Sequence, residues 1–278
     1  MQKGELMTLE LKDATFELND GVARFTLNRP EALNALSEQM RVDFRAMLDF
    51  VERNDEVSVL IIGGEGRAFC AGGDVKRMQA RQGTTPGYKS RDSVLEMHGW
   101  LQRLHNLDCP VIAAVNGLAF GGGFALALVA DFVIASTNAK FSSVFGRIGL
   151  IPDMALLYTL PRLLGMQKAK EIMYTARSIG VQEAQALGLV LAVHAPEALD
   201  DEVDAFARRL AKGSKAAMGV TKQLVNRSLE SDYQTMARYE ADGQALMFDT
   251  DFHREAVDRF VGKQPSRYNW DELTHGND

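Results

Sequence analysis

The chain has 278 residues, of which 46% are hydrophobic and 24% charged, as in an ordinary globular protein and unlike a disordered one. Its formal net charge of −6, from 31 basic and 37 acidic residues, provides no general basic surface for nucleic acid. The only cysteines, Cys70 and Cys109, have no metal-ligand spacing and are too few for a disulfide framework, which is typical of a reducing compartment.

The first predicted elements are two β-strands, residues 14–18 and 22–27, joined by a hairpin turn, Asn-Asp-Gly. Ser37 is expected to cap a helix that runs to about residue 54, because its apolar residues recur on one face. A continuous apolar strand and a glycine-rich loop over residues 63–74 follow.

Helices and apolar strands then alternate, with a helix over 91–106, strands over 111–115 and 132–136, and a short strand near Phe141. This alternation predicts an α/β fold whose sheet is covered by helices. After about residue 161 the patterns become mostly helical, so we expect a division into residues 1–200 and 201–278 without a linker between them.

One segment, residues 109–130, has 22 residues without a charge and is long enough to span a membrane. It contains Pro110, Asn116 and four glycines, which favour a buried strand, a turn and a buried helix instead. The N-terminal MQKGELMTLELKD contains no apolar core of signal-peptide length. We therefore expect a cytoplasmic protein without a membrane partner.

Two glycine loops, GGEGRAFCAGGD and GLAFGGG, each follow an apolar strand. Neither has the spacing of a P-loop or of a dinucleotide-binding turn, so a nucleotide-phosphate site is not expected. Both expose backbone N–H groups, and the second opens a helix whose first N–H groups lack internal partners. Two such groups aimed at one point would form an oxyanion hole, although the spacing alone favours glycines that serve only tight turns and close packing.

The segments AFCAGGD (68–74) and IAAVNGLAFGGGFALALVADF (112–132) closely resemble the crotonase superfamily, the enoyl-CoA hydratase/isomerase family. The resemblance extends from FTLNRPEALNAL near the N-terminus to REAVDRFVGK near the C-terminus. It implies a ββα spiral that binds acyl-CoA over residues 1–200 and a helical trimerisation region over 201–278, assembled as a homotrimer or a hexamer. It also implies an acyl-CoA thioester substrate, in which CoA is part of the substrate and no separate cofactor is needed.

The resemblance also assigns roles to individual residues. It makes the N–H groups of Gly73 and Gly122 the oxyanion hole for the thioester carbonyl. Asp74 is expected to hold the first loop, whereas Glu31 stands where relatives often carry a basic residue for a phosphate. The residues implied in CoA binding are Ala68, Cys70, Asp74, Lys76, Phe260 and Lys263, the last two often across a subunit boundary.

The proton-transferring group is the part of the site that differs from a hydratase. Hydratases of this family use two glutamates, and the matching positions here hold Ala125 and Phe145, so two-glutamate hydration is disfavoured. Asp153, in GLIPDMALLYTLP, resembles the aspartate that follows Ile/Val-Pro in isomerase members of the family. A single carboxylate close to two carbons can take a proton from one and return it to the other, and apolar surroundings would raise its pKa. The alternative is a helix cap, worth about 1 kcal/mol.

The remaining candidates are weaker. Cys70 could be a nucleophile but is more commonly a small buried thiol, and His98 could line the acyl site or only pack. The histidines have no metal-ligand spacing, so no metal is expected. An apolar substrate pocket is expected around Phe120, Ala125, Phe145 and Leu150.

Three functions remain open from the sequence. The first is an enoyl-CoA isomerase that uses Asp153. The second is another crotonase reaction, such as hydration, thioester hydrolysis or aryl-CoA dehalogenation. The third is a non-catalytic CoA-ester binder.

Overall fold

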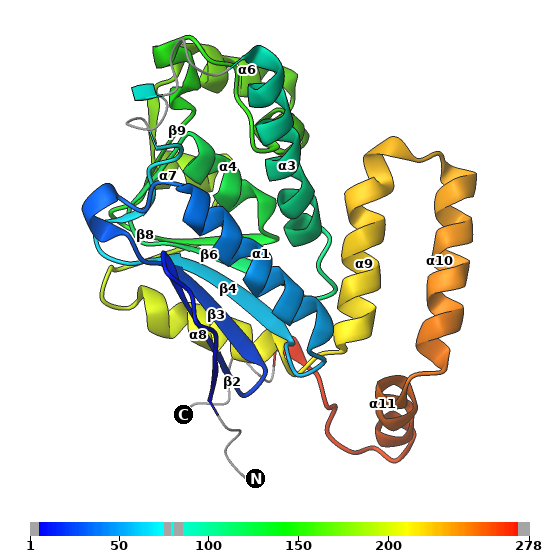
Figure 1. Ribbon diagram of the computed structural model, residues 1–278. Helices are drawn as coiled ribbons and strands as arrows, with labels where there is room; N and C mark the ends of the chain where they lie inside the picture. The colour runs from blue at the N-terminus through cyan, green and yellow to red at the C-terminus, as the bar shows by residue number, and fades with distance from the viewer. Residues whose placement is uncertain (1–5, 75–78, 81–85, 272–278) are drawn as a thin grey trace.

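A computed structural model of the chain describes residues 6–74, 79–80 and 86–271. These form a large sheet of seven strands with helices on both faces, a small sheet of four strands, and a helical arm (Figure 1). The α/β prediction is therefore confirmed. The strands of the large sheet, in spatial order, are β1 (Met7–Thr8), β2 (Ala14–Asn19), β3 (Val22–Leu27), β4 (Val59–Gly64), β6 (Val111–Val115), β8 (Phe132–Ser136) and β11 (Ala192–His194).

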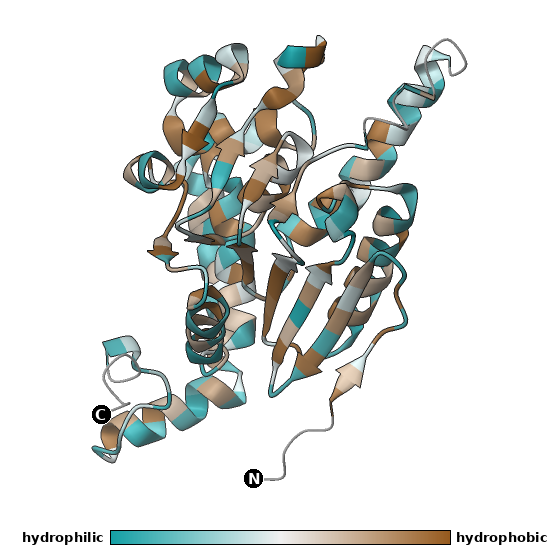
Figure 2. Cartoon of the chain, turned by 90° about the vertical axis from the view of Figure 1, so that its left-hand side faces the viewer, coloured by the Kyte–Doolittle hydropathy of each residue, from teal (hydrophilic) through white to brown (hydrophobic). Residues whose placement is uncertain are grey.

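The hairpin of β2 and β3 is antiparallel, and the strands from β3 to β11 pair in parallel. Alternate residues of the central strands enter two separate cores. In β4, Leu60 and Ile62 pack on the side of α1 (Glu38–Arg53), whereas Val59 and Ile61 pack against α8 (Leu199–Leu210). Burial on both faces explains why these strands are continuously apolar in sequence (Figure 2).

The predicted helix after Ser37 is confirmed, and its cap is the predicted residue. The Ser37 hydroxyl accepts a hydrogen bond of 2.8 Å from the N–H of Met40, and the buried face of α1 carries its apolar residues. The helix predicted over 91–106 begins four residues earlier, as α3 (Gly87–His105). The other helices are α4 (Gly122–Val129), α5 (Leu156–Leu164), α6 (Met166–Thr175), α7 (Val181–Ala186), α9 (Lys215–Arg227), α10 (Tyr233–Phe248) and α11 (Asp251–Val261), with short 3₁₀ turns η1 (Pro30–Ala32), η2 (Val144–Ile148) and η3 (Ser228–Glu230).

The small sheet was not predicted. Its strands, in spatial order, are β10 (Ser178–Gly180), β9 (Lys140–Ser142), β7 (Leu118–Phe120) and β5 (Ala68–Cys70). The sequence analysis treated β5 as part of a glycine-rich loop and β7 as a glycine turn, and both assignments are wrong. Three-residue strands are too short to show an alternating pattern, and glycines on either side hide them.

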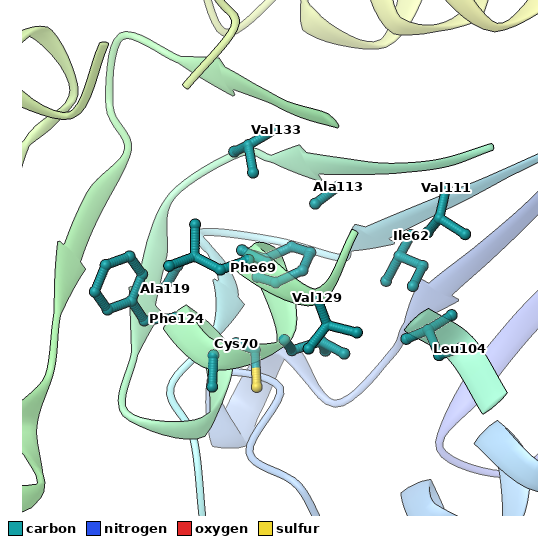
Figure 3. Close-up of a cluster of buried hydrophobic side chains, with 14 of the residues drawn as sticks. Ile62, Phe69, Cys70, Leu104, Val111, Ala113, Ala119, Phe124, Val129 and Val133 are labelled. Carbon is teal, nitrogen blue, oxygen red and sulfur yellow. The ribbon is translucent and has the colours of Figure 1, made fainter. Parts of the chain in front are cut away.

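The buried helix α4 lies between the two sheets. Phe124 and Val129 from this helix share one apolar cluster with Phe69 and Cys70 of β5 and with residues of the large sheet (Figure 3). No helix within the described residues is long and apolar enough to cross a membrane. The charge-free segment 109–130 forms β6, β7 and α4. The buried strand and the buried helix that were predicted for it are therefore confirmed.

The C-terminal arm consists of α9, α10 and α11 and stands beside the body (Figure 1). Lys222 of α9 attaches it, because its Nζ lies 2.8 Å from Oδ2 of Asp131 and donates to the carbonyl of Cys109 at 3.1 Å. The Asp131 carboxylate also accepts from the N–H of Val111, the first residue of β6. α8 crosses the predicted boundary at residue 200 and packs onto the large sheet, and the division at that position stays a prediction.

Candidate active site

The small sheet brings the two glycine loops together. Strands β5 and β7 are parallel, with Ala68 opposite Leu118 and Cys70 opposite Ala119. The carboxyl ends of parallel strands lie at the same edge of a sheet, which is where loops converge on ligands in α/β proteins. The loop after Cys70 and the turn after Phe120 therefore leave from neighbouring points.

Glycines allow the two loops to touch. Gly72 has a φ of +93°, and a Cβ on it would lie 2.7 Å from the carbonyl oxygen of Phe120 and 2.9 Å from the nitrogen of Gly122. A Cβ on Gly123 would lie 2.0 Å from the carbonyl oxygen of Cys70. The close-packing alternative for these glycines is confirmed, and the oxyanion hole stays a prediction.

The two predicted donors, Gly73 and Gly122, lie in these loops. Gly122 is the first residue of α4, where a helix leaves its N–H without an internal acceptor. Gly73 forms an isolated parallel bridge with Leu36 in which the carbonyl of Gly72 accepts from Leu36. No acceptor for either donor N–H is found among the described residues. Two adjacent N–H groups of this kind can bind a developing oxyanion.

Asp153 directly precedes a residue that packs on the second donor. The next residue, Met154, is buried, and its Sδ would lie 2.6 Å from a Cβ on Gly122. Met154 and Ala155 both have left-handed backbones, with φ of 52° and 67°. Left-handed conformations cost non-glycine residues free energy and are concentrated at functional sites. This unusual turn places the half-buried Asp153 next to the residue that packs against the predicted hole.

The side chain of Asp153 does not cap a helix. Helix α5 begins at Leu156, its N-cap position is Ala155, and no side chain bonds to the N–H groups of its first turn. Asp153 contributes only its backbone carbonyl, which accepts from Leu156 at 3.0 Å. The alternative that Asp153 is an N-cap is therefore wrong, because the two left-handed residues delay the start of the helix.

The surroundings of Asp153 favour proton uptake. Burial raises the pKa of its carboxyl above the ordinary value, although electrostatic interactions with His98 and Arg41 oppose this shift. His98 belongs to α3 and Arg41 to α1, so residues of two other elements act electrostatically on the carboxylate. A carboxylate with a raised pKa is a stronger base once it is ionised.

The residues predicted to line the pocket occupy different environments. Phe145 in η2 is nearly buried, and its ring lies 3.8 Å from the position of a Cβ on Gly121. Ala125 is fully buried in α4, and Phe120 is the half-buried last residue of β7. Leu150 is 49% exposed. Phe120 and Phe145 thus lie at the second loop, and the backbone N–H of Leu150 donates to the carbonyl of Phe145 at 3.0 Å.

The predicted CoA-binding residues are also separated. Ala68 and Cys70 belong to β5, and Asp74 ends the first loop with its Oδ2 3.8 Å from Nη2 of Arg29. Lys76 lies outside the described residues. Phe260 is 86% exposed on α11, and Lys263 follows that helix at the end of the arm, well away from α4 (Figure 1).

Cys70 is a structural thiol. Its side chain is fully buried, and burial raises the pKa of the thiol to about 12. Its Sγ accepts a hydrogen bond of 3.4 Å from the N–H of Gly72. A thiol that stays protonated at neutral pH is a poor nucleophile, which favours the packing alternative.

Leu36 and Arg41 lie near the site but were not predicted as site residues from the sequence. The N–H of Leu36 donates to the carbonyl of Gly72 at 2.8 Å, and its Cδ1 would lie 3.4 Å from a Cβ on Gly122. Arg41 lies in the first turns of α1, donates to the hydroxyl of Ser93 in α3 at 3.2 Å and acts electrostatically on Asp153. In the sequence, Arg41 is a basic residue beside the buried face of an amphipathic helix. Such residues are too common to be predicted as functional on that ground.

Other cavities and ligand clusters do not compete with this site. A cavity of about 850 Å³ lies between α5 and the arm, lined by residues such as His105, Tyr158, Lys222 and Phe252, and none of the glycine-loop residues belongs to it. Within the described part of the chain, no group of three His, Cys, Asp or Glu side chains could hold a metal ion.

Comparisons with known proteins identify the family of the chain. The family model for enoyl-CoA hydratase/isomerase matches residues 17–271. The chain is 35% identical to the 1,2-epoxyphenylacetyl-CoA isomerase of Escherichia coli K12 over 89% of this chain and 95% of the relative. It is 34% identical to the short-chain-enoyl-CoA hydratase of Clostridium acetobutylicum over 92% and 97% of the two chains.

Solved structures show the same fold. A crystal structure of an enoyl-CoA hydratase/isomerase from Cupriavidus metallidurans CH34 superposes with a TM-score of 0.89 at 36% identity, covering 94% of this chain and 97% of that one. The matches extend over both glycine loops, the Asp153 segment and most of the arm. The chain therefore belongs to the enoyl-CoA hydratase/isomerase family and has the crotonase fold.

Proposed function

We propose that this enzyme isomerises the double bond of an enoyl-CoA thioester, with Asp153 as the group that moves the proton. The observation that carries the proposal is the position of Asp153, half-buried beside the residue that packs on Gly122, with a raised pKa. Fully buried Ala125 and nearly buried Phe145 occupy the positions where the family's hydratases carry their two glutamates. The relative named 1,2-epoxyphenylacetyl-CoA isomerase supports isomerisation of a CoA thioester in general, since its named substrate is an epoxide and not an enoyl-CoA.

The reaction needs one base and one oxyanion hole. The ionised carboxylate of Asp153 takes a proton from the carbon next to the thioester carbonyl of a 3-enoyl-CoA. The electron pair of that C–H bond moves onto the carbonyl oxygen, where the N–H groups of Gly73 and Gly122 stabilise the dienolate. Asp153 then returns the proton to the far end of the original double bond, giving a 2-enoyl-CoA. Loss of one such donor typically costs about 10²–10³ in rate.

The acyl portion is expected to lie on an apolar surface that includes Phe120, the last residue before the second loop, and Phe145, whose ring lies 3.8 Å from a Cβ on Gly121. CoA would enter as part of the substrate, with the backbone of β5 near its adenine. No second carboxylate replaces the missing glutamates within these positions, and for this reason water addition is the less favoured reaction.

The mass of the product distinguishes the two reactions. With a 3-enoyl-CoA substrate, we expect a product of unchanged mass whose double bond has moved to the 2-position, detected by mass spectrometry and NMR. With a 2-enoyl-CoA, we expect no adduct with the mass of one added water. Rapid formation of a 3-hydroxyacyl-CoA would show instead that the enzyme is a hydratase.

The pH dependence follows from the raised pKa of Asp153. Only the ionised carboxylate can accept a proton, so kcat should increase with pH through a single ionisation that lies above the ordinary aspartate value of about 4. The measurement is the α-proton exchange rate of a saturated acyl-CoA in deuterated buffers. A rate that is constant down to the pH at which the protein unfolds would contradict this assignment.

The arm supports assembly into a homotrimer or a hexamer. It carries exposed large apolar residues, among them Val225, Leu229, Leu246, Phe260 and Val261. Large exposed apolar surfaces commonly bind other subunits. We expect light scattering to give a mass of three or six chains. In such an assembly Phe260 and Lys263 would reach the CoA of a neighbouring copy, and a monomeric mass would contradict this expectation.

A further inference from the structure

The segment before α1 bonds to the first glycine loop, and its Leu36 also lies close to Gly122 of the second loop. Asn34, at its centre, is fully buried and has a left-handed backbone with φ of 55°. Its side-chain oxygen accepts from the N–H of Arg29 at 2.8 Å, and its Nδ2 donates to the carbonyls of Glu65 at 2.9 Å and Ala68 at 2.7 Å. One buried amide thus connects the segment to both ends of the turn that leads into β5.

The same segment also bonds to the loop beyond β5. The N–H of Ala71 donates to the carbonyl of Leu33 at 2.9 Å, and the N–H of Leu36 donates to the carbonyl of Gly72 at 2.8 Å. These two bonds lie on either side of Asn34 in sequence. The loop is therefore held immediately before Gly73 by backbone groups whose positions depend on the conformation around Asn34.

The bond to Gly72 determines the direction of the next N–H. The carbonyl of Gly72 and the N–H of Gly73 belong to one planar trans peptide group, in which C=O and N–H point in opposite directions. Because the carbonyl points to Leu36, the N–H of Gly73 points away from Leu36. The Gly73 N–H is the first-loop donor of the proposed oxyanion hole.

We propose that Asn34 is a positioning residue that fixes the direction of the Gly73 N–H through the Leu36–Gly72 hydrogen bond. The proposal rests on the proposed function, because it concerns a donor of the same oxyanion hole. Asn34 touches neither substrate nor reacting atoms. It acts by keeping the 33–36 segment in the one conformation from which Leu36 can bond to Gly72.

The test uses Asn34→Gly, which keeps a left-handed backbone without strain and removes the side chain together with its amide group. The probe is butyryl-CoA labelled with ¹³C at the thioester carbonyl, whose C=O stretching frequency in the bound state reports the strength of the hydrogen bonds to its oxygen. In the wild type we expect a lower frequency than in water. In Asn34→Gly we expect the band to return towards the value in water, with kcat for α-proton exchange reduced on the order of tenfold and little change in KM.

Asn116→Ala is the matched control. Its Nδ2 donates to the carbonyls of Gly64 and Gly66 in the same turn, at 2.8 and 2.7 Å, but it has no bond to the 33–36 segment. We expect this variant to lose stability without shifting the carbonyl band. A folded Asn34→Gly protein with the wild-type frequency would overturn the proposal for Asn34 alone. A wild-type band at the frequency found in water would overturn the oxyanion hole itself, and the role of Asn34 with it.

Discussion

Asp153→Asn is expected to lower the α-proton exchange rate of a saturated acyl-CoA by about 10²–10⁴-fold, the range that a positioned general base contributes. Asparagine has nearly the same shape but cannot accept a proton at neutral pH. The dissociation constant of the CoA ester should change little, because the N–H groups of Gly73 and Gly122 remain in place. Exchange is measured by mass spectrometry in deuterated water, and binding by calorimetry.

Stability provides an independent check that Asp153→Asn is folded. Burial raises the pKa of Asp153 above its value in the unfolded chain, so its ionisation destabilises the folded state as pH rises through the raised pKa. The variant should therefore be at least as stable as the wild type at neutral pH. This advantage should vanish below the ordinary aspartate pKa of about 4, where the wild-type carboxyl is protonated in both states.

Asp49→Asn is the control for removing a carboxylate. Asp49 also lies on an element next to the site, helix α1, but it is exposed and bonds to Arg103 on the surface. Its replacement should leave the exchange rate unchanged. If Asp153→Asn exchanges α-protons as fast as the wild type, Asp153 is not the base and another group must be found.

Gly72→Ala is expected to have the second largest effect. The new Cβ would lie 2.7 Å from the carbonyl of Phe120 and 2.9 Å from the nitrogen of Gly122, at a φ of +93°. The two loops must then separate, which misaligns both donors and should lower the exchange rate on the order of 10²-fold or more. The backbone strain alone should cost about 1–3 kcal/mol, measured by urea unfolding.

Gly99→Ala tests whether adding any methyl group has this effect. Gly99 lies in the interior of helix α3, and no atom lies within 4 Å of its added Cβ. Because glycine destabilises a helix interior, the substitution should raise stability by about 0.5–1 kcal/mol and leave the rate unchanged. A Gly72→Ala enzyme with the wild-type exchange rate would contradict the arrangement of the hole.

The strongly periodic elements could be predicted from the sequence. The hairpin of β2 and β3, the Ser37 cap of α1 and the strands β6 and β8 follow from local patterns, and the structure confirms them. The short strands β5 and β7 could not be predicted, because each is stabilised by pairing with a partner 50 residues away rather than by its own composition. The placement of the two loops at one edge depends on that pairing.

The alternatives for Asp153 could not be separated by sequence. Asp followed by an apolar helical pattern is a good N-cap sequence. What excludes the cap is the left-handed backbone of Met154 and Ala155, and neither residue type indicates such a conformation. The backbone is held there by tertiary contacts, including the packing of Met154 against Gly122, which belongs to a different element.

The proposed role of Asn34 could not be predicted from the sequence for a related reason. In the sequence it belongs to LNRPEALNAL, where an asparagine between apolar residues is an ordinary turn residue. Its three hydrogen bonds reach backbone groups up to 34 positions away. Every residue has a backbone carbonyl, so the sequence does not indicate which carbonyls a side chain will bind. Residues that act through main-chain atoms are therefore the hardest to predict from sequence patterns.

The pairing of β5 with β7 has a consequence for how such enzymes diverge. Both candidate donors are peptide N–H groups at the ends of paired strands, and no single substitution other than to proline can delete a peptide N–H. A carboxylate, in contrast, disappears with one change of codon. Selection can therefore exchange the acid or base around an unchanging pair of donors, and relatives named as hydratases and as isomerases can differ from this chain by similar amounts. Within this fold, overall identity measures descent, whereas the reaction is determined by a few exchangeable side chains.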